Sequence, residues 1–167
     1  QVSLLMQGFN SDHKSLVPII TAHKGIASID EAARLLLESF ATVDESSQRI
    51  QFNIGKVVSF ENKQICRYFA SGRHLDALER LMEKKYLDMA LAEQELLILA
   101  IDEADKCPVP LARVIRALSN HLEQAGVTSV RFALAGVNPY FTRITDEDPG
   151  VARFFYRVLM LRPLPES

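Results

Sequence analysis

The chain has 167 residues, of which 48% are hydrophobic, and its 19 basic and 21 acidic residues leave a formal net charge of −2. This length and apolar content are typical of one globular domain and exclude a disordered chain, while the balanced charge excludes an electrostatic surface for nucleic acid or an anionic membrane. Cys66 and Cys107 lie too far apart to indicate a disulfide framework or a zinc site. No apolar run approaches the roughly 20 residues of a membrane span, so we expect a cytoplasmic protein with no membrane partner.

Both ends of the sequence are typical of a piece cut from a longer protein. No Met precedes Gln1, and residues 1–6 resemble the inside of an amphipathic helix without a capping residue before it. Residues 163–167 are typical of a linker. We therefore expect residues 1–167 to form a single partial domain that is incomplete at its N-terminus.

The first half of the sequence predicts a strand, a helix, a small hairpin and a helical stretch. Residues 15–22 are a short apolar run typical of a strand, and the capping box Ser28-x-x-Glu31 begins a helix behind it. The apolar positions of that helix are Ala32, Leu35, Leu36 and Phe40. Alternation over residues 50–54 and a second run at 57–60 predict a hairpin insertion over residues 48–62. Leucines at helical spacing in residues 74–93 predict one long or two short surface helices.

The second half alternates strands and helices. Residues 96–101 are apolar throughout, as a strand buried on both faces of a parallel sheet requires. A helix over about residues 110–124 leads to a second buried strand at 130–135. A short helix from Asp148 to about residue 156 precedes a last strand at 158–161. This alternation predicts an α/β fold with a mostly parallel sheet.

Two adjacent carboxylates, Asp102 and Glu103, follow the most apolar strand. In open α/β sheets, ligands bind beyond the carboxyl ends of the strands. Asp102 can hold the hydrated Mg²⁺ that bridges nucleotide phosphates, while Glu103 can orient and deprotonate the attacking water. The alternative is that both residues only begin the loop after a core strand, but an apolar run followed by Asp-Glu-Ala-Asp favours the functional interpretation.

Residues 97–106 resemble the Walker B motif of P-loop ATPases, and their surroundings resemble the AAA+/STAND branch of that class. The resemblance extends from the strand at residues 17–20, through residues 131–138, to residues 151–155. It implies a P-loop NTPase-like three-layer core with ATP and Mg²⁺ as cofactors. It also implies that hydrolysis drives conformational change or assembly in a larger protein.

The resemblance implies roles for three further residues. Asn138 matches the polar sensor that touches the γ-phosphate or the attacking water, although Asn138 before a proline also suits a plain turn. Arg153 and Arg157 precede the last strand, where the family places an arginine finger that reaches the nucleotide of a neighbouring subunit. A homo-oligomer is therefore the implied assembly, and ordinary solvated arginines are the alternative.

The front of the sequence departs from the family. No G-x-x-x-x-G-K-[ST] motif occurs in the 167 residues, so the Walker A loop that cradles the phosphates is absent. We expect this chain alone to bind ATP weakly and to be inactive. Residues 3–7 resemble the helix that follows a Walker A loop, so we expect that loop in preceding sequence and a lid domain in following sequence. Nucleic acid or protein partners would then act through other domains.

Three other interpretations stay open. A superfamily 2 helicase core is one, because residues 102–105 spell that family's motif, although residues 135–138 lack its Ser-Ala-Thr. A non-catalytic ATPase-fold interaction scaffold is favoured by the absent phosphate loop. An unrelated α/β binding domain would make the carboxylate pair a coincidence.

The family's strand order gives an expectation for the sheet. The strands around Val17, Ile98 and Phe132 should be parallel neighbours, with the strand of Ile98 in the middle. The strand that leads into the phosphate loop would separate residues 130–135 from residues 158–161, so we expect no direct pairing between these two segments.

Overall fold

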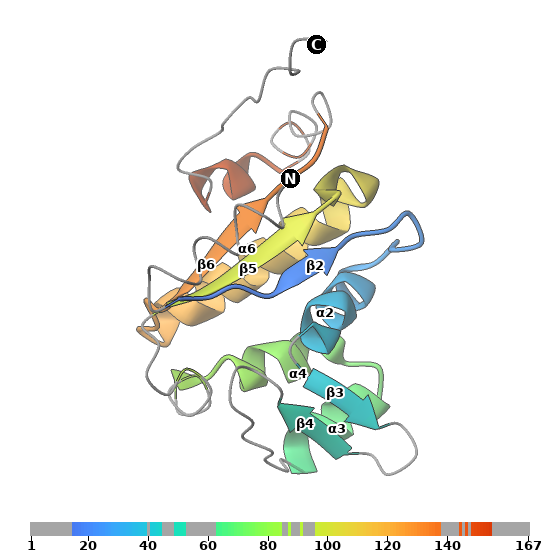
Figure 1. The fold of residues 1–167 in the computed structure, drawn as a ribbon, viewed down its shortest axis with the longest axis vertical. Helices are drawn as coiled ribbons and strands as arrows, with labels where there is room; N and C mark the ends of the chain where they lie inside the picture. Colours follow the sequence, from blue (N-terminus) through green and yellow to red (C-terminus); the bar gives the residue numbers. More distant parts are fainter. Residues whose placement is uncertain are drawn as a thin grey trace, which may run out of the picture.

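A four-stranded parallel sheet organises the part of the chain that the computed structural model describes (Figure 1). The described residues are 15–39, 41–44, 49–52, 63–84, 87, 91, 96–137, 144, 146 and 148–154, and for 41–44, 49–52 and 152–154 only the backbone is described. β5 (Leu96–Asp102) lies in the middle, with β1 (Ser15–Leu16) and β2 (Ile19–Thr21) along one edge and β6 (Val130–Leu134) along the other. The predicted order of parallel strands is confirmed.

β1 and β2 are two pieces of one predicted strand. Both pair with β5 in the same register, Ser15 opposite Leu96 and Ile19 opposite Ala100. Pro18 separates them because it has no N–H to donate to the ladder. Its carbonyl still accepts a hydrogen bond from the Ala100 N–H at 3.1 Å, so the strand continues across the interruption.

α2 (Ile29–Glu38) begins at the predicted capping box. The Ser28 hydroxyl accepts a hydrogen bond from the Glu31 N–H at 3.1 Å, and the Glu31 carboxylate accepts one from the Ser28 N–H at 2.9 Å. Hydrogen bonds from the backbone N–H groups of Ala27 and Ser28 hold the pKa of Glu31 below its usual value. The helix buries Ala32, Ala33, Leu36 and Leu37. Leu35 is half-buried, and Phe40 lies outside the described residues.

The hairpin differs from the prediction. β4 (Arg49–Phe52) coincides with its expected first arm, but β4 pairs antiparallel with the upstream β3 (Ala41–Asp44), with Ala41 opposite Phe52. The expected second arm, residues 57–60, lies outside the described residues. β3 was not predicted because the alternation of apolar and polar residues in Ala-Thr-Val-Asp is too short to identify a strand from the sequence alone.

Three further α-helices of the described part of the chain lie beside the sheet. α3 (Lys63–Ala70) was not predicted, whereas α4 (His74–Leu81) falls in the predicted helical stretch and buries one face. α6 (Pro108–Gln124) begins at Pro108 rather than Pro110, because the first turn of a helix tolerates residues without an N–H. Its predicted buried stripe is confirmed and consists of Leu111, Val114, Ile115, Leu118 and Leu122.

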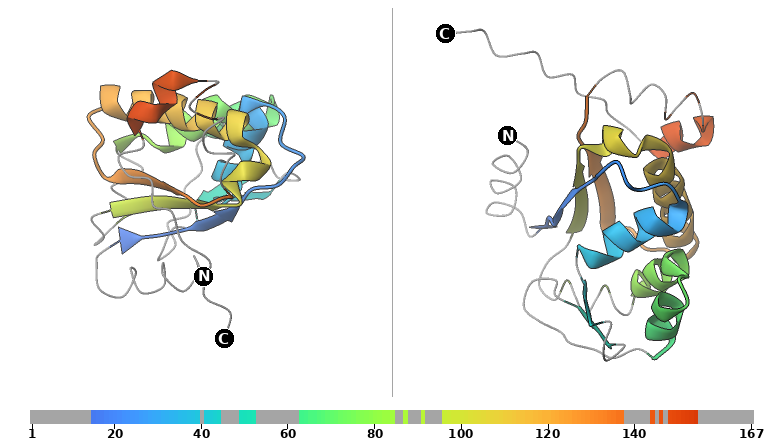
Figure 2. Two further views of the ribbon diagram at one scale, coloured as in Figure 1. Left: turned by 90° about the horizontal axis from the view of Figure 1, so that it is seen from above. Right: turned by 90° about the vertical axis from the view of Figure 1, so that its right-hand side faces the viewer.

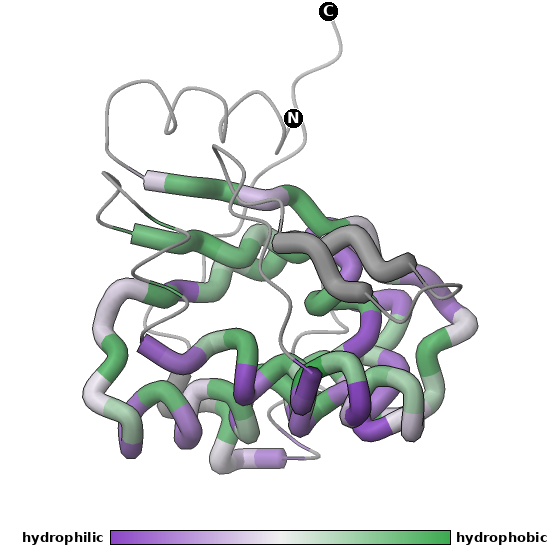
Figure 3. The backbone as a smooth tube through the Cα atoms, turned by 90° about the horizontal axis from the view of Figure 1, so that it is seen from below, coloured by the Kyte–Doolittle hydropathy of each residue, from purple (hydrophilic) through white to green (hydrophobic). Residues whose placement is uncertain are grey.

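The helices α2, α3, α4 and α6 all lie on one face of the sheet (Figure 2). On β5 the side chains of Leu97, Leu99 and Ile101 are buried in the core that these helices share. Figure 3 shows the strands of the sheet as mainly hydrophobic and the helices as alternating between hydrophobic and hydrophilic positions. No described helix covers the opposite face, so the second helical layer of a three-layer core stays a prediction.

Two elements near the end of the described chain differ from expectation. β6 is not a buried strand, because only Val130 is buried and Arg131 is exposed. Among the described strands β6 pairs only with β5, so it is an edge strand there. The helix expected after Asp148 is the 3₁₀ helix η2 (Pro149–Phe154), in which the Val151 N–H donates to the Asp148 carbonyl at 2.9 Å. The strand expected at residues 158–161 lies outside the described residues.

Candidate functional site

β5 carries Asp102 to the carboxyl end of the sheet. Thr21 of β2 lies opposite Asp102, and the Asp102 carbonyl accepts a hydrogen bond from the Ala22 N–H at 2.9 Å. On the other side, the Ile101 carbonyl accepts one from the Ala135 N–H at 2.8 Å. The backbone at the end of β5 is therefore hydrogen-bonded to both neighbouring segments, which fixes the place from which the Asp102 side chain projects.

Glu103 has a backbone conformation that residues other than glycine rarely adopt. Its φ of 52° and ψ of 33° lie in the left-handed region, and among the described residues it is the only non-glycine with positive φ. The Glu103 N–H donates to Asp102 Oδ1 at 2.9 Å, and the Glu103 carbonyl accepts from the Lys106 N–H at 2.9 Å. These bonds hold a conformation that costs free energy, and such strain clusters at functional sites.

The turn after Glu103 binds the loop that follows β6. In the short 3₁₀ helix η1 (Ala104–Lys106), the Ala104 N–H donates to the Ala135 carbonyl at 2.8 Å. Asp105 Oδ1 accepts a hydrogen bond from the Val137 N–H at 3.1 Å. No separate role for Asp105 was predicted from the sequence. An acidic residue two positions after Glu103, in the same turn, was nevertheless a sign that a further carboxylate could lie at this site. Asp105 fixes the loop immediately before Asn138.

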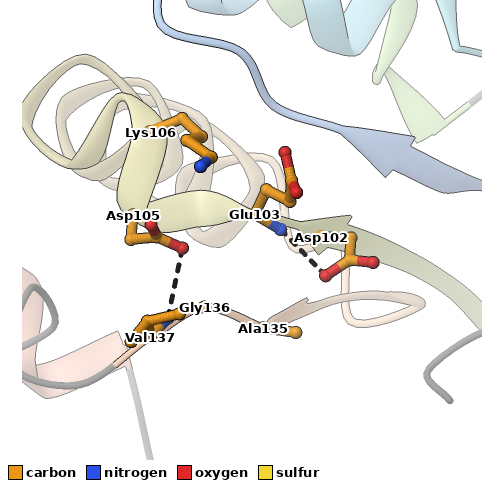
Figure 4. Close-up of a pocket in the computed structure, with 7 residues that line it drawn as sticks. All are labelled: Asp102, Glu103, Asp105, Lys106, Ala135, Gly136 and Val137. Atoms are coloured by element: carbon orange, nitrogen blue, oxygen red, sulfur yellow. Dashed lines mark hydrogen bonds between the residues drawn. The ribbon is translucent and has the colours of Figure 1, made fainter.

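A pocket of about 350 Å³ lies between this turn and this loop (Figure 4). It is lined by Asp102, Glu103, Asp105, Lys106, Ala135, Gly136 and Val137. In Figure 4 the Asp102 and Glu103 side chains diverge, and Asp105 turns toward Val137. Three carboxylates and one ammonium give the pocket an acidic excess, which suits a divalent cation or a ligand that brings one.

The donor set fits a hydrated Mg²⁺ better than a metal held by protein alone. Among the described residues there is no group of three or more His, Cys, Asp or Glu placed to hold a metal ion. Mg²⁺ usually keeps several waters and uses one or two carboxylates together with substrate phosphates. Asp102 and its neighbours supply carboxylate oxygens of that kind, so the residues present fit such an ion.

Cys107 lies next to the acidic turn but is not a nucleophile for this site. Its side chain is buried, and burial raises the pKa of the Cys107 thiol to about 11. A thiol with that pKa stays protonated at neutral pH, and only a thiolate is an effective nucleophile. Cys107 also does not line the pocket, whose ionisable side chains are those of Asp102, Glu103, Asp105 and Lys106.

The other predicted site residues are described only in part. Asn138 and Arg157 lie outside the described residues, and for Arg153 the backbone within η2 is described but not the side chain. Asp102 and Glu103 are thus the two predicted residues that the structure brings together in one pocket.

Comparison with protein-family models, curated proteins and solved structures finds no match for this chain. The ATPase interpretation therefore depends on the residues themselves. Among the described helices, none has the length and apolar character to cross a membrane.

Replacing Glu103 by Gly should raise the stability of the protein while removing the carboxylate. The left-handed conformation costs a residue other than Gly about 1–2 kcal/mol in the folded state. Gly raises the conformational entropy of the unfolded chain, which lowers stability by about 0.4–1 kcal/mol. The relief of strain is the larger of the two effects. We expect the free energy of unfolding, measured by urea denaturation, to rise by about 0.5–1 kcal/mol. The control is Glu123→Gly in α6, an exposed helical position where Gly should lower stability. A fall in stability for Glu103→Gly would contradict the strain.

Proposed function

We propose that this chain is the Mg²⁺-binding and water-activating part of an ATPase of the AAA+/STAND type. The observation that carries the proposal is the pair Asp102 and Glu103 at the carboxyl end of the central strand, with Glu103 in a left-handed conformation at the edge of an acidic pocket. Glu103 is strained and exposed, and Asp102 beside it is half-buried. Backbone strain clusters at functional sites, and ligands of open α/β sheets bind at this end of the strands, so both features support a ligand site.

The divergent side chains support a division of labour between the two carboxylates. Mg²⁺ bound through water to Asp102 would neutralise the phosphate charge of ATP. Glu103 is exposed to the pocket and can take a proton from a water molecule, whose oxygen then attacks the γ-phosphorus while ADP leaves. Asp105 holds the loop before Asn138 against this turn through the Val137 N–H. That contact would keep a polar sensor at position 138 close to the reacting phosphate.

The proposal also requires a phosphate cradle and an arginine finger. No phosphate-binding loop motif occurs in them, so a phosphate cradle must come from residues outside them. An arginine finger, for which Arg153 and Arg157 are the candidates, would act across an interface between copies of the protein. The proposed activity therefore belongs to the full-length protein, and its work would be conformational change or assembly.

A non-catalytic interaction scaffold is the second candidate. The observation that favours it is the missing phosphate-binding motif. A scaffold function does not require a strained carboxylate. The scaffold hypothesis therefore predicts that Glu103 can be replaced without loss of function. The two candidates are distinguished by whether nucleotide turnover depends on the acidic pair.

Replacing Asp102 by Ala should remove the Mg²⁺ contribution to ATP binding. Calorimetry of the full-length protein with ATP, in Mg²⁺ and in EDTA, measures this contribution. We expect the affinity in Mg²⁺ to fall by at least about tenfold, because loss of even an outer-shell metal partner costs about 10- to 100-fold in metal affinity. The affinity in EDTA should stay unchanged.

The control for this experiment is Asp76→Ala on α4. Asp76 pairs with Arg73 and does not line the pocket, so its loss should leave Mg²⁺-dependent binding unchanged. Equal Mg²⁺ dependence in wild type and Asp102→Ala would remove Asp102 from the metal site.

A further inference from the structure

An ion pair joins α6 to the segment that carries Arg153. Arg116 Nη1 donates to Asp148 Oδ1 at 2.7 Å and to Oδ2 at 2.8 Å. The Arg116 side chain is 45% exposed and the Asp148 side chain 21%. A pair this open to solvent contributes little to overall stability. It joins two segments that are 32 residues apart in the sequence.

Asp148 also organises the first turn of η2. Its Oδ1 accepts a hydrogen bond from the Gly150 N–H at 3.1 Å, and its carbonyl accepts one from the Val151 N–H at 2.9 Å. One carboxylate therefore both caps the 3₁₀ helix and binds Arg116. Movement of the Arg116 side chain would be transmitted directly to the backbone of η2.

Gly150 makes the close approach of Arg116 possible. A Cβ at this position would lie 3.1 Å from both Cζ and Nη1 of Arg116 and 3.2 Å from Asp148 Oδ1. These distances are shorter than ordinary van der Waals contact between such atoms. A side chain at position 150 would therefore require the guanidinium or the carboxylate to shift by a few tenths of an ångström.

A small second core joins the same helix and the same segment. Ala112 of α6 packs with Ile144 and Val151 in a buried cluster separate from the main core. A cluster of three residues buries little apolar surface, so it needs the polar contacts to hold a single position. η2 thus contacts α6, and the described buried side chains of the segment, Ile144 and Val151, pack in this cluster.

α6 connects this attachment to the acidic site. The helix begins at Pro108, directly after the turn of Asp102 to Lys106, and Arg116 lies about 12 Å further along its axis at 1.5 Å per residue. A helix whose stripe is buried in the core is a rigid spacer. The position of η2 relative to Glu103 is therefore set through α6.

We propose that Arg116 and Asp148 are positioning residues that hold η2, and with it the backbone of Arg153, at a fixed place on α6, so that the arginine is presented to the nucleotide of a neighbouring subunit in one orientation. This inference depends on the proposed ATPase function, in which Arg153 is a candidate arginine finger. Without the pair, the arginine reaches the phosphate less often in the reactive geometry, while ATP binding itself is unaffected. Arg116 and Asp148 themselves would touch neither the nucleotide nor the attacking water.

The test compares kcat and KM for ATP in the full-length protein with the pair disturbed in two ways. Arg116→Met removes the charge, and Gly150→Ala keeps the charge but displaces it. We expect kcat to fall at least about tenfold in both variants and KM to change little. The basis is that a misplacement of about 1 Å in a catalytic group costs roughly 10²-fold in rate. Arg116→Lys should retain most of the activity, because one guanidinium nitrogen makes both contacts and an ammonium can replace it.

Arg113→Met is the matched control, since Arg113 is an exposed arginine on the same helix. Its charge also lowers the pKa of Asp148, although Arg116 lowers that pKa more. An equal loss of kcat in Arg113→Met would overturn the inference, because net charge alone would then explain the effect. Amide hydrogen exchange gives the structural measurement. The Val151 N–H should exchange faster in Arg116→Met and Gly150→Ala, while the Leu97 N–H of β5 should not.

Faster exchange at Val151 with unchanged kcat would overturn the positioning role and leave the ATPase function intact. Slow exchange at Val151 in both variants would overturn the attachment itself. A wild-type protein whose turnover does not depend on Glu103 would overturn the proposed function and this inference together.

Discussion

Replacing Glu103 by Gln should stop ATP turnover in the full-length protein and leave ATP bound. The amide keeps the size and shape of the side chain but cannot take a proton from water. A positioned general base contributes about 10²- to 10⁴-fold to a rate, so we expect kcat to fall by at least about 100-fold. Because Asp102 is unchanged, the affinity for ATP in Mg²⁺ should stay within about twofold of wild type.

Phosphate release measures the turnover, and calorimetry with ATP measures the affinity. Glu123→Gln is the matched control, because Glu123 is an exposed carboxylate of α6 outside the pocket. It should have wild-type turnover. If Glu103→Gln and wild type hydrolyse ATP equally fast, Glu103 is not the base, and the scaffold becomes the better interpretation.

Replacing the proposed arginine finger should give the other large effect. An arginine finger contributes about 10³- to 10⁵-fold to kcat, because its planar guanidinium stabilises the charge that develops on the transferred phosphoryl group. We therefore expect Arg153→Ala or Arg157→Ala to lower kcat by at least about 10³-fold with ATP binding retained. Lysine at the same position should restore little, since an ammonium lacks the planar fork.

A mixture of variants tests whether the finger acts between subunits. An inactive arginine variant mixed with inactive Glu103→Gln should recover part of the activity, because a mixed interface pairs an intact carboxylate with an intact arginine. Arg67→Ala on α3, an exposed arginine outside the pocket, is the control and should hydrolyse ATP normally alone. A monomeric protein, or full turnover in both arginine variants, would remove the finger from the mechanism.

The sequence by itself determined the elements whose signals are local or periodic. The apolar run of β5, the stripe of α6 and the capping box of Ser28 and Glu31 each specify their own structure, because burial and capping act within a few residues. The end of β5 at Asp102 also followed, since a run of apolar residues that stops at a carboxylate marks the edge of the sheet. The candidate carboxylate pair was predictable for that reason.

Tertiary structure decided what depends on residues far apart in the chain. The pairing of β4 with β3 and the exposure of β6 depend on which neighbours are present, and no pattern within one strand specifies its neighbours. Asp148 binds the first turn of η2 through two backbone N–H groups and also binds Arg116, which lies 32 residues away in the sequence.

The site shows the same division between local and distant information. The adjacency of Asp102 and Glu103 is written in the sequence, but the left-handed backbone of Glu103 is not. That strain persists only because surrounding contacts hold it. Asp105 binds Val137, and Arg116 binds Asp148, each across 32 residues of sequence, and only folding of the intervening chain brings these partners within hydrogen-bonding distance.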